Sequence, residues 1–201
     1  MDDMTKRLVP PRPDAKVMDR LERALVAAAE ERGLVDLAYE TVDSPVGKLF
    51  VAASGHGLAR IAYADEGEEP WLNELAQKVS PRIVRAPRRT ERIVRELDEF
   101  FAGRRTRFDI PIDFVLAKGF GRRVLEAALQ IPYGETRSYS QVASLAGSER
   151  AYRAAGTALG RNPIPIVVPC HRVLHSGGGM GGYTGGLDRK LKLLEIESAH
   201  A

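Results

Sequence analysis

The residues of this 201-residue chain most suited to chemistry are its only cysteine, Cys170, and the histidine that follows it, His171. A thiolate is a strong nucleophile, and an imidazole beside it can accept the thiol proton. A single thiol cannot form an internal disulfide, nor can it build a cysteine-rich zinc site or an iron–sulfur cluster. The competing interpretation is an inert core thiol, because free cysteine is among the most buried residue types.

The composition suits a protein that keeps its thiol reduced. The chain is 44% hydrophobic, enough for one core or two small adjacent ones, and it has a single cysteine. It lacks an apolar run of about eighteen residues, which excludes a transmembrane helix. Met1-Asp2-Asp3 does not begin a basic-then-apolar secretory signal. We therefore expect a cytoplasmic protein with no membrane partner.

The charge is unevenly distributed along the chain. The whole sequence carries +3, but from Ala117 onward eleven Lys or Arg face six Asp or Glu, which makes that segment +5 and the rest −2. A basic half that carries the nucleophile indicates a polyanionic partner such as nucleic acid, although a solvated surface gives similar counts.

The first 35 residues read as an arm followed by an amphipathic helix. Residues 1–12 are polar and proline-rich, which predicts a loose arm. Apolar residues recur at helical spacing between Asp14 and Arg32, and Gly33 stops the pattern. The mixed charges of this helix favour docking on the rest of the chain or on a second copy over a membrane-surface role.

Residues 36–114 predict a small α+β domain without a catalytic constellation. Three short apolar runs between Leu37 and Tyr63, separated by turn residues, predict an antiparallel meander. The remaining pattern predicts helices over 71–79 and 90–102, and strands over 83–84 and 108–112.

Residues 115–201 predict a helical domain. Helices are expected over 122–129, over 138–145 with Ser138 or Ser140 as N-cap, and over 149–159. The last two, joined by a glycine-containing turn, form a helix-turn-helix pattern. The second of them presents Arg153 among small residues such as Ala154 and Gly156. Such a surface suits either tight helix packing or close approach to a DNA groove with one inserted cation.

Five segments then follow in a distinctive order. They are Asn162-Pro163, a short apolar strand, Pro169-Cys170-His171-Arg172-Val173, a glycine-rich run through Gly182-Tyr183-Thr184-Gly185-Gly186-Leu187, and Leu193-Leu194 followed by Glu197. From about Phe120 to Glu197 this sequence resembles the O6-alkylguanine-DNA alkyltransferases, also called methylated-DNA–protein-cysteine methyltransferases. The meander resembles the N-terminal domain of that family.

The resemblance implies a ribonuclease-H-like α+β domain followed by a winged-helix-like alkyltransferase domain. It also implies the one-step transfer of a methyl group from O6 of guanine, in double-stranded DNA, to Cys170. The protein would bind the minor groove as a monomer, flip the alkylated base out of the stack, and use no cofactor. It would be consumed, because a thioether has no good leaving group.

The same resemblance assigns catalytic roles. His171 would be the base, acting through a water, and Glu197 would orient it, although the residues alone leave Glu195 an equal candidate. Asn162 would be the hinge that ties the DNA-reading helix to the active-site strand. Tyr139 would help a proton reach N3 of the leaving guanine and rotate a DNA phosphate.

Further roles concern DNA and the flipped base. Arg153 would take the place of the flipped base in the stack, with Ala154 and Gly156 beside it at the groove. The base pocket would be lined by Val173, Tyr183, Thr184 and Gly185.

The chain departs from the family pattern at two packing positions and leaves other functions open. Gly121 and Leu125 stand where Gln and Trp are frequent, and the single cysteine predicts that the structural zinc of some members is absent. The main alternative is a sensor of the alkyltransferase-like class, in which the reactive cysteine is replaced. A helix-turn-helix regulator would not explain the joint placing of Asn162, His171 and Glu197, and a Cys–His hydrolase is not supported by an independent oxyanion-hole motif.

Overall fold

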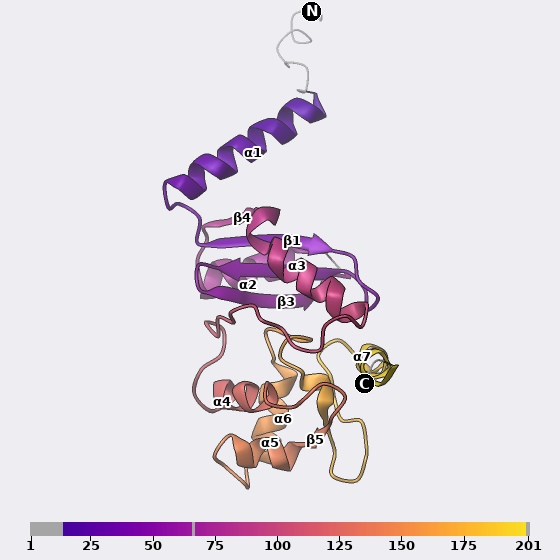
Figure 1. The fold of residues 1–201 in the computed structure, drawn as a ribbon. Helices are drawn as coiled ribbons and strands as arrows, with labels where there is room; N and C mark the ends of the chain where they lie inside the picture. The colour runs from indigo at the N-terminus through magenta and orange to yellow at the C-terminus, as the bar shows by residue number, and fades with distance from the viewer. Residues whose placement is uncertain (1–13, 66, 200–201) are drawn as a thin grey trace, which may run out of the picture. The chain divides into compact units, whose positions relative to one another are not determined.

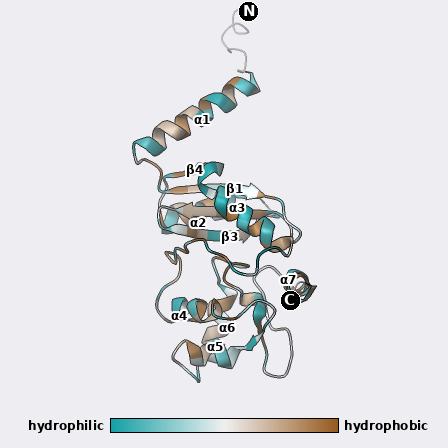
Figure 2. Cartoon of the chain, viewed as in Figure 1, coloured by the Kyte–Doolittle hydropathy of each residue, from teal (hydrophilic) through white to brown (hydrophobic). Residues whose placement is uncertain are grey.

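The computed structural model describes residues 14–65 and 67–199, so the arm predicted for residues 1–12 lies outside the described residues (Figure 1). The chain divides into two compact units, Met1–Val35 and Asp36–Ala201. In the first, helix α1 spans Ala15–Glu31, and the Asp14 carboxylate caps it by accepting from the Lys16 N–H. This confirms the predicted helix. None of its residues is buried, and Figure 2 shows hydrophilic and hydrophobic residues alternating along it.

The second unit begins with a four-stranded sheet in the order β3-β2-β1-β4. Strands β1 (Leu37–Val42), β2 (Leu49–Ser54) and β3 (Gly57–Tyr63) pair antiparallel, which confirms the predicted meander. Strand β4 (Ile83–Arg85) pairs parallel with β1.

Two helices cover opposite faces of this sheet. Alternate residues of a strand point to opposite faces, so Phe50 packs in one apolar cluster with Leu75 of α2 (Glu69–Lys78). Val51 packs in the other cluster with Leu97 of α3 (Pro87–Phe101). Helix α3 starts three residues earlier than predicted because Pro87 is well suited to the first helical turn, where its missing N–H is not needed.

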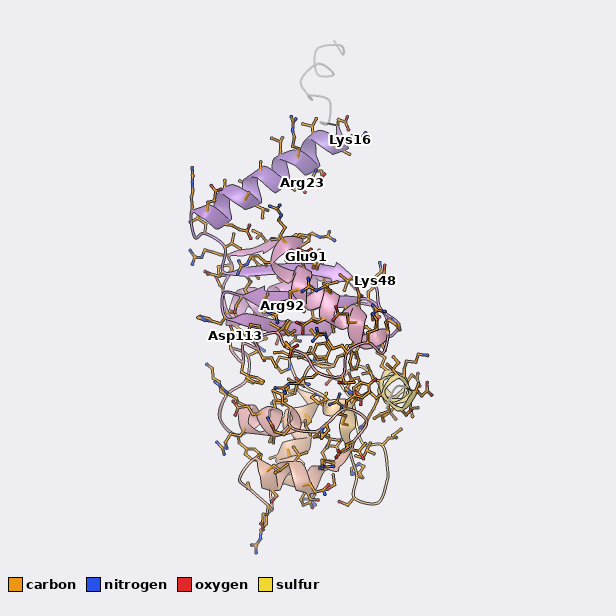
Figure 3. The ribbon with its side chains drawn as sticks, in the orientation of Figure 1. Lys16, Arg23, Lys48, Glu91, Arg92 and Asp113 are labelled. Carbon is orange, nitrogen blue, oxygen red and sulfur yellow. The ribbon has the colours of Figure 1, made fainter. Side chains whose placement is uncertain are left out.

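The strand predicted over 108–112 is wrong. Only Ile112 pairs with the sheet, as an isolated bridge to Leu58. The segment touches the sheet there through two backbone bonds, Leu58 N–H to the Pro111 carbonyl and Asp113 N–H to the Leu58 carbonyl. Proline lacks an N–H, so Pro111 cannot extend the ladder. Asp113, labelled in Figure 3, also accepts from the Ser54 hydroxyl at 2.5 Å, which anchors the connection to the next elements.

The rest of the unit is mainly helical (Figure 1). It contains α4 (Gly119–Ala128), α5 (Tyr139–Leu145), α6 (Tyr152–Gly160) and α7 (Leu187–Ala199), with a short parallel pair of β5 (Arg137–Ser138) and β6 (Val173–Leu174). Helices α5 and α6 confirm the helix-turn-helix pattern. Ser138 is the N-cap of α5, and it forms a capping box with Gln141.

The short apolar strand predicted after Asn162 is also wrong. Residues between α6 and the 3-10 turn η2 (Cys170–Arg172) form an irregular buried segment with one isolated bridge, Pro165 to Val168. Three prolines interrupt the ladder there, and Ile166 has a φ of 76°. The nucleophile therefore lies on a tight turn.

One apolar core joins the sheet to the helical part. The cluster that holds Val51 and Phe100 also holds Val124 of α4 and Cys170 itself. The thiol thus belongs to a packed core that both parts build.

Candidate active site

The Glu197 carboxylate lies between His171 and Arg172, all three of them buried. His171 Nε2 is 2.8 Å from Glu197 Oε1, and Arg172 donates through Nε and its second terminal nitrogen to the same carboxylate at 2.8–3.1 Å. The other terminal nitrogen of Arg172 donates to the Ile131 carbonyl at 2.6 Å. Because Glu197 accepts from Nε2, the proton of the neutral imidazole lies there, and the free lone pair is on Nδ1.

The electrostatics keep this imidazole in its neutral form, which can act as a base. Burial lowers the pKa of His171, although the bond to Glu197 acts in the opposite direction. Burial alone would raise the pKa of Glu197, but hydrogen bonds from His171 and Arg172 outweigh it and lower that pKa. Nδ1 of His171 is buried and has no hydrogen-bond partner among the described residues. The arrangement is therefore a base with one open position.

Cys170 is held as a buried thiol. It is 4% exposed, and burial raises its pKa to about 11. The Asn162 amide donates to Sγ at 3.1 Å and to the Val168 carbonyl at 2.9 Å, while its oxygen accepts from the Ile164 N–H. Asn162 therefore ties the segment after α6 to the thiol. The resting sulfur is protonated, so reaction requires a base.

Lys190 is a site residue that the sequence reasoning missed. Its ammonium is buried and donates to the backbone carbonyls of Val173, at 2.7 Å, and Met180. Its positive charge lowers the pKa of Cys170 and so opposes the effect of burial. Lys190, Leu193 and Glu197 are the buried residues of α7, spaced three and four apart, so they share one face.

The same helical spacing separates the two glutamate candidates. Glu195 is exposed, whereas Glu197 is buried on the face that meets His171. The sequence did contain a signal for Glu197, because helical spacing puts it on the same face as the apolar Leu193. The same spacing indicates Lys190. Arg172, which is buried against Glu197, belongs to the motif around Cys170, but the motif alone does not show its role.

A cavity of about 640 Å³ opens beside the helix-turn-helix. Burial raises the pKa of two tyrosines in its wall, Tyr139 and Tyr183. The Tyr183 ring meets the ring of His171, the residue after Cys170, edge to face with centres 6.4 Å apart. Its lining residues are Tyr139, Tyr152, Arg153, Gly156, Gly160, His175, Gly182, Tyr183 and Thr184.

Most of the predicted DNA and pocket residues meet at this cavity. Arg153 is exposed at its rim and its guanidinium lies 5.7 Å from the Tyr152 ring centre. Ala154 is exposed on the same helix but does not line the cavity. Val173 is fully buried and Gly185 faces Tyr63, so neither is a lining residue.

Gly181 explains how Tyr139 fits. A side chain on Gly181 would place Cβ 2.4 Å from the Tyr139 hydroxyl, and one on Gly156 would lie 3.7 Å from its ring. Gly181 also has a φ of 64°, which glycine adopts without strain. The Tyr139 hydroxyl donates to the Gly182 carbonyl at 3.5 Å. Gly181, in the loop between β6 and α7, thus leaves the room that this tyrosine occupies at the cavity.

The two departures from the family pattern are packing positions here. Leu125 is 2% exposed in the core, and a Cβ on Gly121 would lie 3.9 Å from Ala158 of α6. Among residues 14–65 and 67–199, no group of three His, Cys, Asp or Glu is placed to hold a metal ion. Over the same residues, no helix combines the length and apolarity needed to cross a membrane.

Comparison with known proteins matches both parts of the chain to one family. Residues 37–114 match the 6-O-methylguanine DNA methyltransferase ribonuclease-like domain, and residues 119–199 match its DNA binding domain. A methylated-DNA–protein-cysteine methyltransferase of Mycolicibacterium paratuberculosis is 43% identical over 82% of this chain and 94% of its own length. A constitutive one from Bacillus subtilis is 36% identical over 79% and 94%.

Solved structures agree. The O6-methylguanine methyltransferase of Mycobacterium tuberculosis is 40% identical, with a TM-score of 0.70 over 82% of this chain and 94% of that one. A structure of the same organism's protein in complex with DNA gives a TM-score of 0.69 with the same coverage. The ribonuclease-like sheet, the helix-turn-helix and the buried Cys–His–Glu site define a cysteine-dependent DNA methyltransferase. The chain belongs to the 6-O-methylguanine DNA methyltransferase family.

Proposed function

We propose that this chain repairs double-stranded DNA by transferring the alkyl group of O6-alkylguanine to the sulfur of Cys170. The observation that carries the proposal is a buried thiol that accepts a hydrogen bond from Asn162 and is followed by the His171–Glu197 pair, with the His171 ring against Tyr183 in the wall of a cavity beside a helix-turn-helix. A buried nucleophile suits a substrate that is brought to it, and base flipping does this at a cost of a few kcal/mol.

The resting site is neutral at the thiol and the imidazole. As sulfur attacks the alkyl carbon, the thiol proton passes to Nδ1 of His171 through a bridging water, and Glu197 stabilises the imidazolium. The S–C bond forms while the C–O6 bond breaks, and its electron pair stays on guanine. Tyr139 delivers a proton to N3 of the leaving base and is reprotonated, through solvent, as the His171 imidazolium releases its proton, so overall the thiol proton replaces the alkyl group. Lys190 and Asn162 favour the developing thiolate.

The helix-turn-helix supplies DNA binding. Helix α6 would enter the minor groove through its small residues, with Arg153 filling the space of the flipped nucleotide. The flipped base would enter the cavity against Tyr183 and Thr184, which line it. The protein would act as a monomer in the cytoplasm.

A sensor that binds lesions without removing them is the second candidate. That class replaces the reactive cysteine, whereas this chain keeps Cys170 together with its amide donor and its base. The retained nucleophile favours transfer.

Intact-protein mass spectrometry separates the two functions. After incubation with a duplex containing O6-methylguanine, the protein should gain the mass of one methyl group. Cys170→Ala should gain nothing while still binding the lesion. Tight binding of the lesion by unmodified wild-type protein would instead establish the sensor function.

A further inference from the structure

Tyr63 reaches the active site from the sheet domain. It is the last residue of β3, and its hydroxyl lies 2.7 Å from the hydroxyl of Tyr183. The two rings meet edge to face, with centres 6.3 Å apart. A side chain at Gly185 would place Cβ 2.2 Å from the Tyr63 ring, so the ring packs directly on that backbone.

Arg189 holds Tyr63 and the same loop together. Its guanidinium lies 4.2 Å from the centre of the Tyr63 ring and forms an ion pair with Asp65. It also donates to the carbonyls of Val46, at 2.7 Å, and Gly185, at 3.1 Å. The sheet domain therefore fixes the loop at two points, the Tyr183 hydroxyl and the Gly185 backbone.

This loop forms part of the cavity wall. Tyr183 lines the cavity and meets the His171 ring edge to face, with centres 6.4 Å apart. Burial raises the pKa of Tyr63 to about 12, so its hydroxyl stays neutral near pH 7. The position of Tyr183 thus depends on Tyr63, which belongs to the sheet and not to the helical part of the chain.

We propose that Tyr63 is a positioning residue that sets which alkyl groups the cavity accepts, by fixing the Tyr183 ring against His171. The proposal rests on the proposed function. A fixed wall holds a small alkyl group at the sulfur, whereas a wall free to move positions a small group less well and admits a larger one more easily. Tyr63 itself is not among the residues that line the cavity.

The test compares two duplexes that differ only in the alkyl group, O6-methylguanine and O6-benzylguanine. Tyr63→Phe keeps the ring on Gly185 and removes the hydroxyl. The ratio of the single-turnover methyl rate to the benzyl rate should fall by about tenfold, mainly through the methyl rate. Arg189→Lys keeps a charge for Asp65 but loses the planar stack on Tyr63, and it should shift the ratio in the same direction.

Tyr39→Phe is the matched control. Tyr39 is a partly buried tyrosine of the same sheet whose hydroxyl donates to Glu68 at 3.3 Å, and its loss should leave the ratio unchanged. Rates are normalised to the folded, titratable fraction of each variant. An unchanged ratio in folded Tyr63→Phe would overturn the proposal. If the wild type accepts neither group, the proposed function fails instead.

Discussion

The buried Arg172 side chain donates hydrogen bonds to both carboxylate oxygens of Glu197, and its Nε lies 3.0 and 3.1 Å from them. A lone buried carboxylate would take up a proton, but a guanidinium fork keeps it ionised. The carboxylate then has an oxygen to spare for His171, which it orients with Nδ1 free. His171 and Arg172, which are adjacent in the chain, therefore both bind Glu197. Arg172 keeps the carboxylate ionised, and the carboxylate orients His171.

Replacing Glu197 should damage chemistry and stability together. In Glu197→Gln the amide no longer fixes the imidazole tautomer, so we expect methyl transfer to slow by about 10²–10⁴. It also leaves the Arg172 charge buried without its counter-ion, which should reduce the free energy of unfolding by about 3–5 kcal/mol. Single-turnover rates and urea denaturation measure the two effects. Glu195→Gln, exposed two residues earlier, is the control, and equal rates in the two variants would refute this role.

Removing the charge of Lys190 should make the thiol harder to ionise. Its ammonium lowers the pKa of Cys170, so Lys190→Met should raise that pKa. The methyl-transfer rate should fall at neutral pH and reach its plateau at a higher pH than in wild type. A pH–rate profile measures this. Lys192→Met, exposed on the same helix, should keep the wild-type profile; if Lys190→Met did so too, the electrostatic role would be wrong.

Much of the fold followed from local patterns in the sequence. The meander, the helices and the helix-turn-helix depend on periodicity and turn residues, which act over a few positions. The two strand predictions that are wrong lie in segments that contain proline, which cannot donate the backbone hydrogen bonds of a ladder. Pro111 stops a strand that its apolar neighbours favoured, and the prolines around Ile166 turn a predicted strand into an irregular buried segment.

The site was predictable only in part. Cys170 and His171 are adjacent, so their pairing is visible in the sequence. Helical spacing places Lys190 and Glu197 on the face of Leu193, but the ion pair of Arg172 with Glu197 depends on how α7 packs, which no local pattern shows. Tyr63 lies 120 residues from Tyr183, and nothing in the sequence around it suggested chemistry.

Arg153 should matter for duplex DNA and not for the chemical step. If it fills the place of the flipped base, Arg153→Ala should slow repair of a methylated duplex by at least tenfold while the reaction with free O6-benzylguanine stays near the wild-type rate. Arg150→Ala removes the same charge just before α6 and should cause only a small, salt-dependent loss. Equal losses on the two substrates would show that Arg153 does not take the place of the flipped base.

Stability should fall in alkaline solution because of Cys170. Its pKa is raised from 9.0 to about 11 in the folded state, so between these values the unfolded chain releases a proton that the folded protein keeps. The free energy of unfolding should therefore drop as pH rises through this window, by up to about 1.4 kcal/mol per pH unit. Chemical denaturation of wild type and Cys170→Ser at several pH values measures the contribution. Identical slopes in the two proteins would show that the thiol is not responsible.

The apolar cluster that contains both Val51 and Cys170 has a consequence for cooperativity. The composition changes near residue 114, yet the larger apolar cluster crosses that point, so the two sides share most of their buried apolar residues. We therefore expect residues 36–199 to unfold in a single calorimetric transition. Damage to the sheet, far from DNA, would then lower the fraction of molecules able to accept an alkyl group.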